Sequence, residues 1–391
     1  MSITTTTSLQ NAVHEKYLEL HGDTPLLVRS PGRVNLIGEH TDYNQGLVLP
    51  AAINKNIIVA IGKRDDRHIQ LYALDQQESF DAALNALERS PLLWPDYILG
   101  VVQQLQQRGH DVGGFNLVFG GDIPQGAGLS SSAALECATG FALNELFDLD
   151  ISRLDIALAA QAAENEFVGV KCGLMDQFAS VFGKEQQLIK LDCADFSYDY
   201  IPFNNPDLCI VLFDTQVKHS LASSAYNERR EQCERGVALI QQHHQHVKSL
   251  RDVTIEQLDE YVKPVDATVY NRCHYVVSEI KRLQDGCEDL KNDDFNAFGQ
   301  RMFETHDGLQ HLYEVSCDEL DVLVDLVRDN DAVLGARMMG GGFGGCTINL
   351  VKIDQVQNLV DTVIGAYNER TGRTAQAYIA NISGGTNVIL D

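Results

Sequence analysis

Polar side chains that could bind a hydroxyl-rich ligand crowd into residues 31–46, which read Pro-Gly-Arg-Val-Asn-Leu-Ile-Gly-Glu-His-Thr-Asp-Tyr-Asn-Gln-Gly. The candidate binding groups are Arg33, Asn35, Glu39, His40, Asp42, Tyr43 and Asn44, and the glycines between them are Gly32, Gly38 and Gly46. Glycine permits positive φ and close backbone approach, so such a segment can turn several polar groups toward one small ligand. The alternative is a polar surface turn in which Asp and Asn cap local structure. This segment alone leaves both interpretations open.

A second segment could bind phosphate. Residues 120–133 read Gly-Gly-Asp-Ile-Pro-Gln-Gly-Ala-Gly-Leu-Ser-Ser-Ser-Ala and lead into a helix that we expect to begin near Ser131. Free N–H groups and the positive end of the helix dipole at such a junction favour phosphate, and Ser132 could reach a metal ion held by it. No Gly-Lys-Ser/Thr follows, so this is not a Walker A loop. The alternative is a serine N-cap with a flexible approach.

Carboxylates for chemistry or metal binding lie between residues 164 and 176. Asp176 stands among apolar residues near a predicted helix start, where it is either an N-cap or a functional carboxylate. Glu164 and Glu166 are two residues apart on a predicted helix and therefore point to different faces. At most one of the two can face a given site, and we expect the other to be solvated.

Two further patterns invite a ligand-binding interpretation. Residues 340–345 formally contain Gly-x-Gly-x-x-Gly, but the run that follows is predicted to be a strand, which excludes a dinucleotide site. The glycines instead indicate close backbone approach, either to another chain segment or to a bound nucleotide. The cluster His243, His244 and His246 has no carboxylate or cysteine at ligand spacing, so we do not expect it to bind metal.

The elements that must position these groups follow from short β-branched and aliphatic runs, for the strands, and from helical periodicity. Strands are predicted near residues 26–29, 57–62, 68–73, 115–119, 187–191 and 209–213, and helices over 96–107, 131–146, 151–167 and 225–241. Long amphipathic helices follow from about Asp266, then a strand at 346–352, a helix, and a last strand near 376–382. We predict an α+β chain with two domains, residues 1–200 and 201–391, and an active site in the cleft between them.

Composition excludes several classes of partner. The 391-residue chain has a formal net charge of −25, which excludes nucleic acid and anionic membranes as main partners. Its nine cysteines show no Cys-x-x-Cys spacing, which argues against a structural zinc site and a disulfide framework. The Ser/Thr-rich residues 1–10 lack the pattern of a signal peptide, and no apolar run is long enough to span a bilayer. We therefore expect a cytoplasmic protein.

Three segments in the same order resemble the motifs of the galactokinase family, in the small-molecule kinase superfamily with homoserine, mevalonate and phosphomevalonate kinases. Residues 31–46 resemble the signature Gly-Arg-x-Asn-Leu-Ile-Gly-Glu-His-Thr-Asp-Tyr, and residues 124–133 resemble the phosphate loop Pro-x-Gly-x-Gly-Leu-Ser-Ser-Ser-Ala. Residues 337–346 resemble the third, C-terminal motif, except that Met339 stands where Thr is expected before the glycines. The resemblance covers nearly the whole chain and implies the two-domain fold of that superfamily.

The resemblance implies ATP-dependent phosphorylation of α-D-galactose at its anomeric hydroxyl, the first committed step of galactose catabolism. It assigns catalysis to Asp176 and Arg33, with Arg33 keeping Asp176 ionised while Asp176 accepts or orients the hydroxyl proton. The implied sugar-binding residues are Glu39, His40, Thr41, Asp42, Gly173 and Tyr226. The implied nucleotide-binding residues are Gly126, Ala127, Gly128, Leu129, Ser130, Ser131 and Ser132. Ser132 and Glu164 are the implied Mg²⁺ ligands, which selects Glu164 over Glu166.

The resemblance and the composition together lead to further expectations. The expected partners are ATP and galactose, without nucleic acid or membrane, and the expected state is a monomer. Trp94 lies either near the adenine or in the core. One alternative function is a non-catalytic sensor of ATP and sugar, although known sensors of this type lack part of the Ser-Ser-Ser-Ala stretch that is whole here. Another keeps the chemistry but changes the sugar to N-acetylgalactosamine or arabinose.

Overall fold

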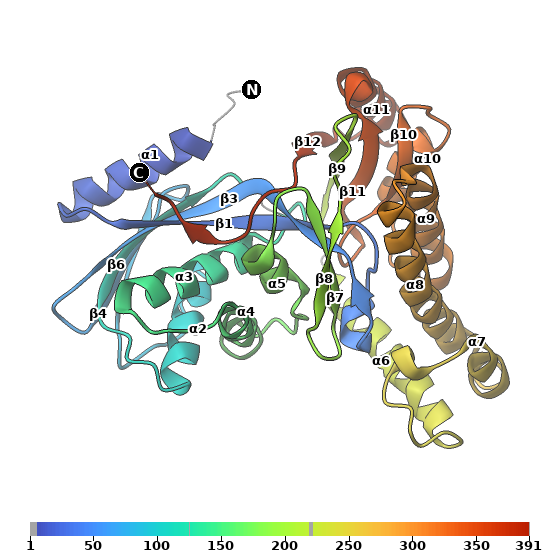
Figure 1. Ribbon diagram of the computed structural model, residues 1–391, viewed down its shortest axis with the longest axis horizontal. Helices are drawn as coiled ribbons and strands as arrows, with labels where there is room; N and C mark the ends of the chain where they lie inside the picture. Colours follow the sequence, from blue (N-terminus) through green and yellow to red (C-terminus); the bar gives the residue numbers. More distant parts are fainter. Residues whose placement is uncertain (1–5, 125, 219–221, 391) are drawn as a thin grey trace.

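The computed structural model describes residues 6–124, 126–218 and 222–390 (Figure 1). The first five residues of the Ser/Thr-rich stretch and Gln125 of the predicted phosphate loop lie outside these ranges. The helices are α1 (Thr6–His21), α2 (Trp94–Gln107), α3 (Ser131–Phe147), α4 (Arg153–Ala162), α5 (Met175–Phe182), α6 (Ala222–Gln241), α7 (Ile255–Gln257), α8 (Ala267–Lys291), α9 (Phe295–Gly308), α10 (Asp318–Arg328) and α11 (Val356–Thr371).

The strands form three sheets. They are β1 (Leu26–Asn35), β2 (Leu47–Val48), β3 (Pro50–Lys63), β4 (His68–Ala73), β5 (Glu78–Ala83), β6 (Phe115–Gly121), β7 (Gln187–Asp192), β8 (Tyr198–Pro202), β9 (Leu208–Lys218), β10 (Val333–Met338), β11 (Gly344–Lys352), β12 (Gln376–Ala380) and β13 (Asn387–Val388). The sheet orders are β13-β1-β3-β6-β4-β5, β10-β11-β9-β12 and β2-β7-β8. All of the pairings are antiparallel except that of β4 with β6.

Helices cover both faces of the six-stranded sheet (Figure 1). Successive side chains of a strand point to opposite faces. Leu27 and Ile58 therefore pack with α1 on one face, while Val28 and Val59 belong to the main core beneath α2, α3 and α4 on the other. Burial on both faces explains the uninterrupted apolar runs at residues 26–28 of β1 and 57–61 of β3.

The second half of the chain packs helices α9, α10 and α11 against the four-stranded sheet (Figure 1). Its helix starts are specified locally: the Asp266 side chain accepts the N–H groups of Thr268 and Val269 ahead of α8, and Asp294 accepts that of Ala297 ahead of α9. Such caps satisfy N–H groups that have no partner within the helix.

The structure confirms the α+β class and refines the predicted elements. The helix predicted over residues 151–167 is α4 followed by a wider π-helical turn, η2 (Ala163–Val168). The boundary near residue 200 stays a prediction, while β13 returns to pair with β1. All nine cysteines are free thiols. In the described part of the chain, no helix has both the length and the apolar character needed to cross a bilayer.

Helix α9 and strand β10 approach so closely that only glycine fits between their backbones. A Cβ on Gly335 would lie 2.3 Å from the Gly299 carbonyl oxygen, and a Cβ on Gly299 would lie 2.2 Å from that of Leu334. Gly335→Ala should therefore lower the free energy of unfolding by about 1–3 kcal/mol, measured by chemical denaturation. As a control, Gly365→Ala on the exposed face of α11, with no atom within 4 Å, should raise it by about 0.5–1 kcal/mol. Equal effects of the two substitutions would contradict this account of the packing.

Candidate active site

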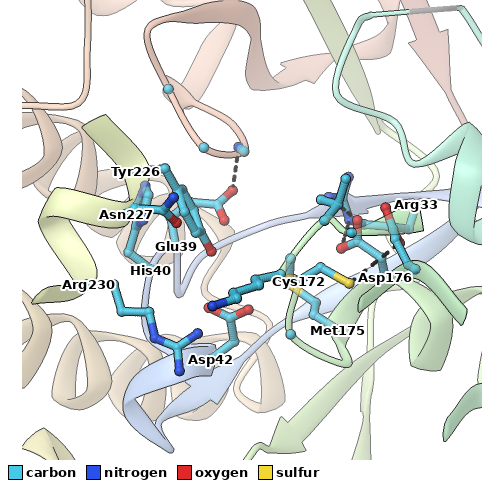
Figure 2. Close-up of a pocket in the computed structure, with 18 of the residues that line it drawn as sticks. Arg33, Glu39, His40, Asp42, Cys172, Met175, Asp176, Tyr226, Asn227 and Arg230 are labelled. Carbon is cyan, nitrogen blue, oxygen red and sulfur yellow. Dashed lines mark hydrogen bonds and ion pairs between the residues drawn. The ribbon is translucent and has the colours of Figure 1, made fainter. Parts of the chain in front are cut away.

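A cavity of about 780 Å³ brings the sugar signature together with residues from the second half of the chain (Figure 2). Its lining includes Arg33, Glu39, His40, Asp42, Glu164, Gly169, Val170, Lys171, Cys172, Gly173, Met175, Asp176, Tyr226, Asn227, Arg230, Glu234, Gly340, Gly341 and Gly342. Glu39, His40 and Tyr226 lie on one side, and Arg33 and Asp176 on the other. This size and the convergence of polar groups are typical of a small-molecule site.

Arg33 and Asp176 form a bidentate ion pair. Arg33 Nε lies 2.8 Å from Asp176 Oδ1, and Arg33 Nη2 lies 2.9 Å from Oδ2. Asp176 is the second residue of α5, whose N-cap position is Leu174, so the N-cap alternative is excluded. The third guanidinium nitrogen, Nη1, donates to the Gly128 carbonyl at 2.5 Å. Bidentate pairing fixes both side chains, because the planar fork of arginine matches the two carboxylate oxygens.

The predicted phosphate loop contacts this pair directly. Gly126 and Gly128 have φ of 78° and 73°, a conformation that glycine adopts without strain. Ser130 occupies the N-cap position of α3 but makes no side-chain cap hydrogen bond; its hydroxyl instead donates to Asp176 Oδ2. The serine-cap alternative is therefore wrong for Ser130. The side chains of Ala127 and Leu129 are buried in the core, so these two residues can offer a ligand only their backbone.

Glu164 faces the loop, whereas Glu166 does not. Glu164 Oε1 lies 3.5 Å from Ser132 Oγ, and its Oε2 accepts a hydrogen bond from Gln177 Nε2 at 2.8 Å. Burial, and then the nearby charge of Asp176, raise the pKa of Glu164 to about 7. Glu166 is exposed and accepts from Gln104 Nε2 at 2.8 Å on a different side. The prediction that these two carboxylates point to different faces is confirmed.

Sequence reasoning missed the buried support behind Glu164. Gln177 Nε2 also donates to Glu136 Oε2 at 3.0 Å, so one amide joins two carboxyl groups. Burial, followed by the charge of Glu164, raises the pKa of Glu136 well above its ordinary value. No sequence signal singled out these residues, because a lone Gln or Glu on an apolar helix is usually exposed.

Four of the predicted sugar-binding residues line one part of the cavity. His40 and Asp42 come from the signature, Gly173 lies before α5, and Tyr226 lies on α6. Burial raises the pKa of Asp42 to about 6 and lowers that of His40 to about 4. A Cβ on Gly173 would lie 2.2 Å from Asp42 Oδ2, so only glycine admits the carboxylate there.

Two predicted residues lie elsewhere. Thr41 is fully buried, is not part of the cavity lining, and has its hydroxyl within 2.9 Å of the Gly38 carbonyl oxygen and 2.5 Å of that of Leu47. Its hydroxyl therefore stabilises the turn, and the prediction that it contacts the sugar is corrected. Trp94 lies in the core and donates through Nε1 to Glu78 Oε2 at 3.1 Å, which supports the core alternative.

Glu39 lines the cavity but is held by Arg337, a residue to which the sequence analysis gave no role. Arg337 is fully buried, and its Nη1 and Nη2 lie 3.0 and 3.1 Å from Glu39 Oε1. The Gly340 N–H donates to the same oxygen at 2.8 Å, and Asn35 Nδ2 donates to Oε2 at 3.0 Å. Burial acts to raise the pKa of Glu39, but Arg337 and the Gly340 N–H hold it below its ordinary value.

The glycine-rich third motif approaches other parts of this chain. A Cβ on Gly342 would lie 2.0 Å from the Val315 carbonyl oxygen, and one on Gly344 would lie 2.5 Å from that of Val217. Together with the Gly340 contact to Glu39, these distances favour the chain-segment alternative. Within residues 6–124, 126–218 and 222–390, no group of three or more His, Cys, Asp and Glu side chains could hold a metal ion. The rings of His243 and His244 pack on Tyr261.

The buried Arg337–Glu39 pair generates a stability prediction. Arg337→Leu leaves the Glu39 carboxylate buried without its cation, so we expect a loss of about 3–5 kcal/mol in the free energy of unfolding. Adding Glu39→Gln to Arg337→Leu should recover part of the loss, because it removes the uncompensated charge. Arg67→Leu, at an exposed pair 3.6 Å from Asp111, is the matched control and should change stability by less than about 1 kcal/mol. A double variant no more stable than Arg337→Leu would contradict the prediction.

Comparisons with known proteins agree with this geometry. Residues 15–63 match the galactokinase galactose-binding signature, residues 96–184 the GHMP kinases N-terminal domain, and residues 288–368 the GHMP kinases C-terminal domain. A galactokinase from a Roseiflexus species is 40% identical over 97% of each chain, and one from Thermotoga maritima is 40% identical over 88% of this chain and 95% of that one.

Solved structures extend the likeness to the fold. The crystal structure of Lactococcus lactis galactokinase complexed with galactose has a TM-score of 0.92 at 35% identity, covering 97% of this chain and 99% of that one. The Methanococcus jannaschii mevalonate kinase shares the fold, with a TM-score of 0.66 at 17% identity over 92% of this chain and 99% of that one. With its signature, phosphate loop and third motif assembled around one cavity, the chain belongs to the galactokinase family.

Proposed function

We propose that this chain transfers the γ-phosphoryl group of ATP to the anomeric hydroxyl of α-D-galactose, giving α-D-galactose 1-phosphate and ADP. The observation that carries the proposal is the Arg33–Asp176 pair, which contacts both the phosphate loop and the cavity. The galactose found in the Lactococcus lactis relative supports the choice of sugar.

Asp176 is proposed to act on the attacking hydroxyl. A sugar hydroxyl is a poor nucleophile, and a positioned carboxylate can accept its proton as the oxygen attacks the γ-phosphorus. Arg33 fixes the orientation of the Asp176 carboxylate through the bidentate pair. The same guanidinium lies beside the Gly128 carbonyl, at the loop proposed to hold the phosphates, and can stabilise charge on the transferring group.

The sugar is proposed to lie against His40, Asp42, Gly173 and Tyr226. His40 Nε2 is buried and has no hydrogen-bond partner in the described part of the chain, so a sugar oxygen would satisfy it. Asp42 offers carboxylate oxygens to sugar hydroxyls. Glu39 Oε1 already accepts bonds from Arg337 and Gly340, so Glu39 would contribute with its remaining acceptor capacity while orienting the turn.

The family's use of ATP implies a divalent cation, and we propose Mg²⁺ held by Ser132 and Glu164. The two side chains offer oxygen atoms, the ligands that Mg²⁺ prefers. Glu164 lines the cavity, and burial and the charge of Asp176 raise its pKa to about 7, an environment in which a cation would favour the ionised carboxylate. When bound, the ion would neutralise charge on the phosphates.

The cytoplasmic location and the monomeric state stay predictions.

A panel of sugars in one coupled ADP assay tests the reaction and its acceptor together. With ATP and Mg²⁺, the purified protein should form ADP with galactose and much less with N-acetylgalactosamine or arabinose. If another sugar of the panel supported faster ADP formation than galactose, that sugar would replace galactose as the proposed acceptor. If the protein bound galactose but formed no ADP, the alternative of a non-catalytic sensor of ATP and sugar would be favoured.

The Asp176→Asn variant separates binding from chemistry in the same assay. It should lower kcat by about 10²–10⁴-fold, the usual contribution of a positioned acid or base, and keep galactose affinity by calorimetry. Asp354→Asn, on the exposed turn before α11, is the control and should leave both unchanged. An Asp176→Asn variant with the wild-type kcat would contradict the assigned role.

Glu164 and Glu166 form a matched pair for testing the metal site. Glu164→Gln should raise the Mg²⁺ concentration needed for half-maximal rate by about tenfold or more, since even outer-shell partners of a metal are worth about 10–100-fold. Glu166→Gln removes the same charge two residues away on another face and should leave that concentration unchanged. Equal Mg²⁺ dependence of the two variants would exclude Glu164 as a ligand.

A further inference from the structure

A chain of buried hydroxyl groups lies behind His40, on the side away from the cavity. His40 Nδ1 lies 2.8 Å from the Tyr43 hydroxyl, which lies 2.8 Å from the Tyr313 hydroxyl. The Cys233 sulfur lies 3.3 Å from the Tyr313 hydroxyl and interacts in turn with the Cys273 thiol. Tyr313 is fully buried in the turn η5 (Leu309–Tyr313), and Arg229 Nε donates to its backbone carbonyl at 2.7 Å.

The position of the proton on His40 decides what the ring can offer a ligand. Burial lowers the pKa of His40 to about 4, so at neutral pH the ring carries a single proton, on Nδ1 or on Nε2. Nδ1 is occupied by Tyr43, and Nε2 is the buried atom without a partner. If Nε2 carries the proton it donates to a ligand oxygen; if it does not, it accepts from a ligand hydroxyl.

The hydroxyl chain can be arranged in two directions. In one, Tyr313 donates to Tyr43 and Tyr43 donates to His40 Nδ1; in the other, Nδ1–H donates to Tyr43, and Tyr313 must donate to the Cys233 sulfur. Sulfur is a weak acceptor, whereas the unprotonated imidazole nitrogen is a strong one and a phenol is a good donor. Burial raises the pKa of both tyrosines well above the ordinary value, so both hydroxyls keep their protons. The first direction is therefore favoured.

The surroundings of His40 hold the ring in one orientation. The ring packs at centroid distances of 4.8 Å from Tyr313 and 5.5 Å from Tyr226, which leaves it little freedom to turn over and exchange its two nitrogens.

We propose that Tyr313, acting through Tyr43, fixes His40 as the tautomer protonated on Nε2, so that this N–H is presented to an oxygen of the sugar. Tyr313 is thus a positioning residue for sugar binding, separated from the cavity by two side chains. The sugar part rests on the proposed function, whereas the tautomer is a property of the protein without ligand.

The tautomer can be read directly by nuclear magnetic resonance of protein labelled with ¹⁵N-histidine. Among the twelve histidines, His40 is identified as the signal missing from a His40→Asn variant. At pH 7.5 and without ligand, we expect its proton on Nε2 and an unprotonated Nδ1. A proton on Nδ1 in the wild-type protein would overturn the proposal, whether or not the protein phosphorylates galactose.

Tyr313→Phe and Tyr43→Phe test the relay. Each removes one hydroxyl, so the ring should become a mixture of both tautomers, and the dissociation constant and KM for galactose should rise about tenfold with kcat little changed. Tyr367→Phe removes a buried hydroxyl bonded to the Thr215 carbonyl at 3.0 Å, and should alter neither the His40 signal nor KM. An unchanged His40 signal in Tyr43→Phe would overturn the proposal even if Tyr313→Phe failed to fold.

The two proposals fail separately. A wild-type protein with the proton on Nε2 that binds no galactose would refute the proposed sugar and keep the tautomer. A protein that phosphorylates galactose, but whose Tyr43→Phe variant keeps the wild-type KM and the wild-type His40 signal, would refute the relay and keep the enzyme.

Discussion

The buried ion pair between Arg337 and Glu39 is the interaction on which the cavity depends. Arg337 lies on β10 and Glu39 follows β1, so the pair joins segments almost three hundred residues apart. Arg337 also donates to the carbonyls of Asn35 and Leu36, and Glu279 on α8 accepts the Gly38 N–H at 2.8 Å. The turn that carries the polar signature is thus held from the second half of the chain. A buried guanidinium is tolerable there because every one of these bonds is charge-assisted.

The cavity concentrates negative charge, and this explains much of its electrostatics. Its lining has five carboxylates and three cations, and one of the cations, Arg33, is already paired with Asp176. Burial, and then the nearby charge of Asp176, raise the pKa values of Asp42 and Glu164. A site that must receive a polyphosphate needs a counter-charge, and a divalent cation at Glu164 would supply it. The net charge of −25 on the chain makes such a local arrangement more necessary.

Much of the fold could be predicted because its signals are local. The strands follow from short β-branched and aliphatic runs, and the helix that begins at Ser131 and the facing of Glu164 and Glu166 follow from the period of 3.6 residues. The π-helical turn η2 could not, because widening a helix by one residue leaves the hydrophobic period almost unchanged. Thr41 was predicted to contact the sugar because it is a polar residue between sugar-binding residues of the signature. Its side chain instead points into the turn, toward the carbonyls of Gly38 and Leu47. The role of Arg337 was missed because its partner, Glu39, lies almost three hundred residues away in the sequence, and such a pairing gives no local signal.

The sequence by itself determined the α+β class, the glycine-rich loops, the acidic character and the family, since these depend on residue types, their order and short-range spacing. Only the tertiary structure decided which polar groups meet. It paired Arg33 with Asp176, directed Ser130 away from a helix cap, and set Tyr313 behind His40. The physical reason is that a hydrogen bond requires two groups within about 3 Å. For residues separated by tens or hundreds of positions, that distance is set by the packing of sheets and helices and is not encoded in any local pattern.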